Sequence, residues 1–291
     1  EDCAAAGRVS SGGTSRDKAA QVTPLPFVIF MIVDVSMDCM LYGGPAYPVL
    51  AAAGVTMVCE PATLTRGHAA KLQAYLETLT VSERKKAQRA GVRHDAWVAL
   101  PDTPAGNELW TDLPRYLSRP GVRGIGALSL EESTPSARRN FQRHVQLAID
   151  VFQANDSGIS CAAGRHHLLL IRTPGGAGMQ RVLDLLRDFG AALDPARILI
   201  EGVDKETAPR VRAEGYWSAV ASCEVGTRWA ADLAAQRDPR LLICSGFTAA
   251  GFTGVIETKH VLEQRGWMPA QLRQLFMEKP CDFLGIIHDD L

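Results

Sequence analysis

The feature that most constrains the fold is an alternation of short apolar segments with segments of helical periodicity, repeated eight times along the chain. The first apolar segment spans residues 27–40, beginning Phe-Val-Ile-Phe-Met-Ile-Val and ending in polar residues. The other seven apolar segments are 55–59, 92–100, 122–130, 167–172, 197–201, 216–222 and 240–244. Strands that are apolar throughout are typical of a parallel sheet covered by helices. The alternation therefore predicts an α/β fold with a parallel sheet.

Helices are expected between the strands, where apolar residues recur every three or four positions. Their approximate ranges are 47–53, 68–90, 109–117, 135–152, 179–189, 206–214, 227–236, 255–264 and 269–278. Eight units in a row without a Gly-x-Gly-x-x-Gly turn favour closure into a (β/α)₈ TIM barrel, with an open doubly wound sheet as the alternative. We expect one barrel domain over residues 26–291, preceded by a disordered or loosely docked tail over residues 1–25.

Composition excludes several kinds of partner. A formal charge of −1 gives no electrostatic footprint for nucleic acid or an anionic membrane surface. The longest apolar run, of about eight residues, is far short of the roughly 20 that span a bilayer. The sequence thus predicts a soluble protein with a small-molecule ligand and no nucleic-acid or membrane partner, and leaves open whether the chain forms a homo-oligomer.

The cysteines indicate a reducing compartment. The chain has 7 cysteines, an odd number, and none of them forms a Cys-x-x-Cys pair. That pattern argues against a secreted disulfide framework and against a zinc site. We therefore expect a cytoplasmic protein without a cofactor.

Function in such a barrel resides at the carboxyl ends of the strands. Side chains on a strand alternate between its two faces, so Asp34, Ser36 and Asp38 are expected to project to the same side as the first strand ends. Other polar residues stand on or just after the later strands. They are Glu60, His94, Ser129, Glu131, Arg172, Glu201, Ser222, Glu224, Ser245 and Thr248.

Several short stretches resemble the TatD-related metal-dependent hydrolases. They are an Asp-x-x-x-Asp run at 34–38 in place of the family's Asp-x-His-x-His, Ala-Ala-Ala-Gly-Val at 51–55, Glu-Pro-Ala at 60–62, Arg-His at 93–94, Leu-Pro-Arg-Tyr-Leu at 113–117, Thr-Pro at 173–174 and Leu-Asp-Pro-Ala-Arg-Ile-Leu-Ile at 193–200. The resemblance covers about residues 27–283. It implies an amidohydrolase-type barrel, independently of the alternation.

The same resemblance shows that the family's metal ligands are missing. The two first-strand histidines correspond to Ser36 and Asp38, and the strand-eight aspartate falls near Thr248, where no acid stands within two residues. The ligands of strands four, five and six correspond to Ala127, Arg172 and Gly202. A site left with one carboxylate has little affinity for a divalent ion. We therefore expect no metal, which sets this chain apart from the family's hydrolytic mechanism.

Two hypotheses follow. In the first, the chain is a metal-independent hydrolase or lyase acting on a small anionic or polar metabolite, with a place in secondary metabolism. Arg172 anchors an anionic group, while Asp38 acts as general acid or base together with Glu60 or Glu201. The residues expected to bind the substrate are Asp34, Ser36, His94, Ser129, Ser245 and Thr248. In the second, the barrel is an inactive pseudoenzyme that binds a ligand or serves as a scaffold, and Arg172 and Asp38 only form a buried salt bridge.

Overall fold

Eight parallel strands form one sheet in the computed structural model, in the order β1-β2-β3-β4-β5-β6-β7-β8. The structure describes residues 31–37, 45–61, 78–98, 117–130, 134–156, 167–173, 175–246, 251–287 and 291. The strands are β1 (Ile32–Asp34), β2 (Val55–Pro61), β3 (Arg93–Val98), β4 (Val122–Ser129), β5 (Leu168–Arg172), β6 (Ile198–Glu201), β7 (Trp217–Ala221) and β8 (Leu241–Cys244). Strand order thus follows chain order, as in a (β/α)₈ barrel.

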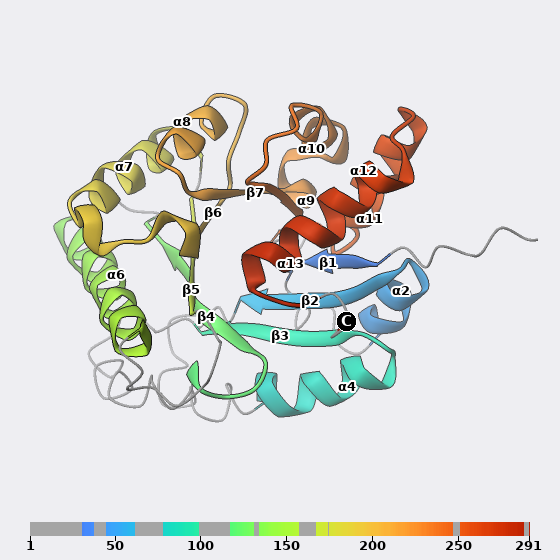
Figure 1. The fold of residues 1–291 in the computed structure, drawn as a ribbon, viewed down its shortest axis with the longest axis horizontal. Helices are drawn as coiled ribbons and strands as arrows, with labels where there is room; N and C mark the ends of the chain where they lie inside the picture. The colour runs from blue at the N-terminus through green and yellow to red at the C-terminus, as the bar shows by residue number, and fades with distance from the viewer. Residues whose placement is uncertain are drawn as a thin grey trace, which may run out of the picture.

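Helices surround this sheet, as Figure 1 shows. The longer helices are α2 (Ala46–Ala52), α6 (Pro135–Asp156), α7 (Gly176–Arg187), α10 (Thr227–Ala234) and α11 (Gly254–Gln264). Shorter turns are η2 (Thr78–Glu83), α4 (Arg84–Arg89), η3 (Gly190–Ala192), η4 (Pro195–Arg197), α8 (Ala208–Ala213), α9 (Ser222–Val225), α12 (Pro269–Arg273), η5 (Gln274–Glu278) and α13 (Lys279–Leu284). None of the helices in the described part of the chain is both long and apolar enough to cross a membrane.

The barrel closes where β1 meets β8. Met37 pairs with Gly246 in a parallel bridge, and the Gly246 amide donates a hydrogen bond of 2.9 Å to the Ser36 carbonyl. A Cβ at Gly246 would lie 2.6 Å from the Cβ of Ala221, so a glycine is needed for this close approach. The predicted single-domain TIM barrel is confirmed.

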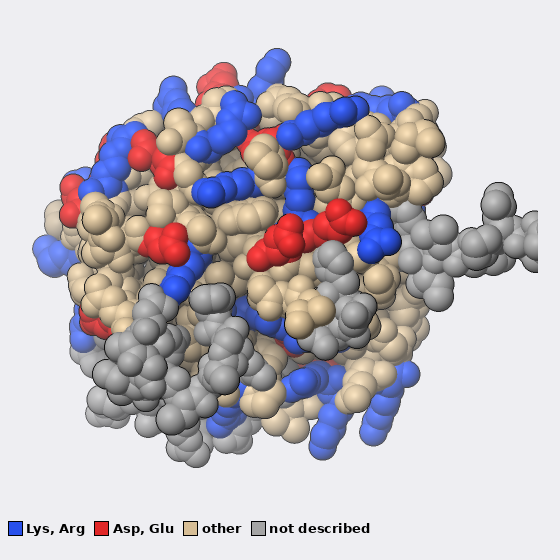
Figure 2. All heavy atoms as spheres, in the orientation of Figure 1, with Lys and Arg blue, Asp and Glu red and all other residues tan. Residues whose placement is uncertain are grey.

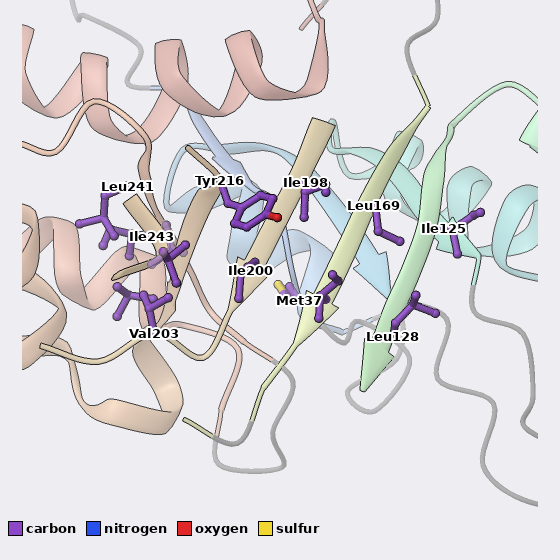
Figure 3. Close-up of a cluster of buried hydrophobic side chains, with 14 of the residues drawn as sticks. Met37, Ile125, Leu128, Leu169, Ile198, Ile200, Val203, Tyr216, Leu241 and Ile243 are labelled. Carbon is purple, nitrogen blue, oxygen red and sulfur yellow. The ribbon is translucent and has the colours of Figure 1, made fainter. Parts of the chain in front are cut away.

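Side chains that alternate along the strands fill two separate apolar regions. Val33, Cys59, Trp97 and Leu199 belong to a cluster inside the barrel. The other face of the strands packs against the helices in a larger outer cluster, part of which is drawn in Figure 3, including Leu169, Ile200 and Ile243. Membership of one cluster or the other shows whether a strand residue faces the barrel interior or the helices.

The amino-terminal end of the barrel is covered by the last helical segment. Met277 of η5 and Phe283 of α13 belong to the interior cluster. The Phe283 ring lies 5.4 Å from the ring of Trp217, the first residue of β7. Arg123, near the beginning of β4, donates a hydrogen bond to the Leu284 carbonyl. Helix α13 therefore plugs the end opposite to the carboxyl ends of the strands.

Most expected elements occur within two or three residues of their expected positions. The first strand is shorter than residues 27–40 within the described range, because strand pairing ends at Asp34 and the chain bends through Val35 and Ser36. The tail over residues 1–25 lies outside the described residues, as does the helix expected at 109–117 apart from Leu117. In the face seen in Figure 2, basic and acidic side chains are interspersed, in keeping with the formal charge of −1.

Candidate functional site

Two polar side chains from distant strands meet at the carboxyl end of the barrel. Glu201 is the last residue of β6 and faces the interior, because Leu199, two residues earlier, belongs to the interior cluster. The Ser36 hydroxyl, which follows β1, donates a hydrogen bond of 2.5 Å to Oε2 of Glu201. Oε1 of Glu201 is buried and has no hydrogen-bond partner among the described residues. This carboxyl group therefore has one satisfied and one unsatisfied oxygen.

A cationic side chain stands beside Glu201. Arg172, the last residue of β5, is the register partner of Glu201. Its guanidinium forms an ion pair with the carboxylate of Glu224 in α9. The side chains of Arg172 and Glu224 are 22% and 29% exposed, whereas Glu201 is 1% exposed. Solvent exposure thus increases across the site, from the buried Glu201 carboxyl group to the partly exposed ion pair of Arg172 and Glu224.

The environment of Glu201 favours its protonated form. Burial raises the pKa of Glu201 to about 7, although the Arg172 charge and the hydrogen bond from Ser36 lower it. The negative charge of Glu224 acts in the same direction as burial. A carboxyl group with a pKa near neutrality can both give and accept a proton at physiological pH.

Asp34 connects the first and last strands. Its carboxylate accepts hydrogen bonds of 3.2 Å from the backbone amides of Ser36 and Ser245. Burial raises the pKa of Asp34 to about 7, while the hydrogen bonds from Ser245 and Ser36 lower it. The Ser245 hydroxyl in turn donates to the Phe252 carbonyl and accepts from the Val255 amide. Asp34 and Ser245 therefore fix the junction between β1, β8 and the start of α11.

Glu60 and His94 form a pair on the other face of the sheet. The His94 ring nitrogen Nε2 lies 2.8 Å from Oε2 of Glu60, and both side chains are 1% exposed. His94 is the register partner of Val58, which belongs to the outer cluster, and the His94 ring meets the ring of Tyr47 in α2 edge-on. The pair thus lies between the sheet and α2, apart from Ser36 and Glu201.

The remaining predicted residues have different places. Ser129, at the end of β4, is exposed and is the register partner of Arg172. Asp38 and Thr248 lie outside the described residues, so the expected pairing of Arg172 with Asp38 stays a prediction. The partner that the structure does give Arg172, Glu224, was weighed from sequence as a strand-end acid but not placed among the predicted catalytic residues. The sequence feature that could have indicated its role is its position three residues after the end of β7, at the carboxyl end of the barrel.

Comparisons with known proteins support the architecture. Among solved structures, the chain is similar to a TatD-like protein from Archaeoglobus fulgidus, with a TM-score of 0.61 and 18% sequence identity over 87% of this chain and 100% of that chain. It is also similar to dihydroorotase from Saccharomyces cerevisiae, solved in complex with 5-fluoroorotic acid, with a TM-score of 0.57 and 11% identity over 89% of this chain and 85% of that chain. No protein-family model matches the chain, and no curated protein matches it either.

The chain has the fold of TatD-like proteins. At these identities the similarity establishes the fold alone, and the fold implied by the sequence resemblance is confirmed. The residues found at the TatD-like ligand positions must be judged by their own chemistry.

The described residues do not fit a TatD-like metal centre. Ser36 is engaged with Glu201, and Arg172 carries a permanent positive charge next to it. A Cβ at Gly202 would lie 2.2 Å from the Thr173 carbonyl oxygen, so this backbone has no room there for a histidine. Within the described part of the chain, no group of three or more His, Cys, Asp or Glu side chains could hold a metal ion.

Proposed function

We propose that the protein catalyses a metal-independent acid–base reaction on a small anionic or polar metabolite at the carboxyl end of the barrel. The observation that carries the proposal is the Glu201 carboxyl group, which is buried, bonded to Ser36 through one oxygen and unpartnered among the described residues at the other. A buried polar atom without a partner is unfavourable, and a ligand that bonds to Oε1 would remove this penalty.

Each residue of the site has a distinct role in this proposal. Glu201 transfers a proton to or from the ligand, for which a pKa of about 7 is suited. The guanidinium of Arg172 attracts an anionic group of the ligand and stabilises negative charge that develops during the reaction. Ser36 holds the Glu201 carboxyl group in a fixed orientation. The reaction class that fits is hydrolysis or elimination, in which one group must accept a proton and later return it.

A specific observation also favours a binding protein without catalysis. Ser36 pairs with Glu201 and Arg172 pairs with Glu224, so the polar groups at the carboxyl end largely satisfy one another. The TatD-like fold does not decide between the two functions, because function depends on the site. The alternative proposal is therefore an inactive TatD-like barrel that binds a ligand or serves as a scaffold.

The experiment that tests the first proposal is a substrate screen with small esters, lactones, amides and phosphate monoesters in the presence of EDTA. We expect turnover that persists with the chelator and falls by roughly 10²–10⁴-fold in Glu201→Gln. Glu214→Gln, which removes a charge from an exposed ion pair with Arg187, is the matched control and should leave turnover unchanged. Turnover that requires zinc, iron or manganese, or that survives in Glu201→Gln, would contradict the proposal. Ligand binding without turnover would support the alternative.

A further inference from the structure

Arg172 is paired with the carboxylate of Glu224, the same chemical group that a carboxylate ligand would present to it. This ion pair lies at the edge of the site, where both side chains are partly exposed to solvent. Glu201, the strand neighbour of Arg172, is bonded instead to Ser36. The charge of Arg172 is therefore balanced in this structure by a side chain of the protein itself.

We propose that Glu224 is a gating residue for the site: its carboxylate occupies the anion-binding face of Arg172, and small carboxylate ligands bind by taking its place. The inference rests on the proposed function, in which Arg172 anchors the anionic group of the ligand. It adds the ligand class, small carboxylates, and an internal competitor that sets how tightly such ligands bind.

The local structure allows Glu224 to leave while α9 stays attached. The first half of α9 is fixed to β8, because the Ser222 hydroxyl donates 2.6 Å to the Cys244 carbonyl and the Cys223 amide donates 3.1 Å to the Ser245 carbonyl. Val225, the residue after Glu224, is 37% exposed, and α9 ends at Gly226 with a φ of 91°. The anchored end and the carboxylate are thus at opposite ends of this one-turn helix.

Once displaced, the Glu224 carboxylate can rotate into solvent. The Glu224 side chain is already 29% exposed, so rotation towards solvent restores hydration without uncovering a core. Moving the Glu201 carboxyl group would be more costly, because that side chain is buried and would lose its hydrogen bond from Ser36. Between Glu201 and Glu224, the acids placed near Arg172 in the described part of the chain, Glu224 is the one that a ligand displaces.

Competition between the Glu224 carboxylate and a ligand for Arg172 raises the apparent dissociation constant of the ligand. When only a fraction of the molecules has the binding face uncovered, the apparent dissociation constant is the intrinsic constant divided by that fraction. Removing the charge of Glu224 raises the fraction and tightens the binding of anions. A purely structural ion pair predicts the opposite pattern, a loss of stability with no gain in affinity.

The test is a calorimetric titration with acetate at pH 6, where acetate is ionised and Glu201 is largely protonated. Glu224→Gln should bind acetate about tenfold more tightly than the parent protein. Glu224→Ala should show the same gain, which guards against a local effect of one substitution. Glu214→Gln removes the same charge from the ion pair with Arg187 and should leave acetate binding unchanged.

A double variant tests whether acetate binds at Arg172. Arg172→Ala combined with Glu224→Gln should lose the gain entirely. The inference is overturned if neither Glu224 variant binds acetate more tightly than the parent, or if the gain persists without Arg172. Because the titration needs no turnover, its failure is distinct from that of the proposed function, which depends on the loss of turnover in Glu201→Gln.

Discussion

The Ser36 hydroxyl donates a hydrogen bond to the Glu201 carboxyl group across 165 positions of sequence, and so joins the first strand to the sixth at the carboxyl end of the barrel. By the resemblance, Ser36 holds the position of a first-strand metal ligand, and Glu201 directly precedes Gly202, which holds that of the strand-six ligand; here Ser36 and Glu201 bond to each other. A buried carboxyl group, whose pKa burial raises to about 7, therefore lies beside positions where the resemblance implies metal ligands.

Stability should fall as pH rises from about 4 to about 7. The pKa of Glu201 rises from 4.5 to about 7 on folding, and that of Asp34 from 3.8 to about 7. The folded state thus holds these protons more tightly, and the stabilisation is complete below about pH 4 and lost by about pH 7. Within that window each group contributes a slope of about 1.4 kcal/mol per pH unit. Urea unfolding at several pH values measures it, and Glu201→Gln should flatten the curve; equal slopes in both proteins would contradict the assignment.

Removing the Ser36 hydroxyl should raise the pKa of Glu201 further, because the hydrogen bond from Ser36 stabilises the ionised form. The carboxyl ¹³C resonance of Glu201, assigned with Glu201→Gln, reports the midpoint directly. We expect Ser36→Ala to move that midpoint to higher pH. The matched control is Ser218→Ala, whose hydroxyl bonds to the Arg240 carbonyl and not to a carboxyl group. A midpoint that falls in Ser36→Ala would show that the hydroxyl is not a donor to Glu201.

His94→Ala should destabilise the fold without affecting the site. It removes the 2.8 Å contact between the His94 ring and the buried Glu60 carboxyl group, and loss of a hydrogen-bond partner from a buried polar group typically costs about 1–3 kcal/mol. Because this pair lies on the helix side of the sheet, acetate binding at Arg172 should stay at the parent value. Chemical denaturation and calorimetry on the same preparations check both statements. A selective loss of acetate binding with unchanged stability would instead place His94 in the site.

Adding a methyl group at Gly202 should be more damaging than adding one at Gly91. Both glycines have positive φ, 88° and 80°, so alanine carries a similar left-handed backbone cost at each. Only at Gly202 does the new Cβ meet a backbone atom, the Thr173 carbonyl oxygen at 2.2 Å, while Gly91 has nothing within 4 Å. Gly202→Ala should therefore lose about 1–3 kcal/mol more than Gly91→Ala in urea unfolding. Equal losses would show that the strand neighbours shift easily.

The sequence predicted the barrel because every strand carries its own apolar run, and that pattern is local. It also predicted that Arg172 and Glu201 belong to the carboxyl end, since each closes an apolar segment. Their partners were harder to predict. Glu224 follows β7 and meets Arg172 from 52 positions away, a contact that depends on how α9 turns after the strand.

The orientation of Glu60 could not be predicted for a different reason. Cys59 faces the barrel interior and Val58 faces the helices, yet both are apolar. When both faces of a strand are buried, the sequence has no polar–apolar alternation from which to read the side of each residue. The same ambiguity applies to His94, and only the packed structure places its ring against Tyr47 and its Nε2 against Glu60.

The junction made by Asp34 and Ser245 has a consequence for how the barrel assembles. These residues are 211 positions apart, whereas each of the other strand pairs joins consecutive strands. Since the entropy lost on closing a loop grows with its length, we expect the β1–β8 contact to form late in folding. A barrel opened there would present two unpaired strand edges, which are templates for association with other chains. By accepting a hydrogen bond from the Ser245 amide, the Asp34 carboxylate helps to keep these two edges together, and so to prevent aggregation.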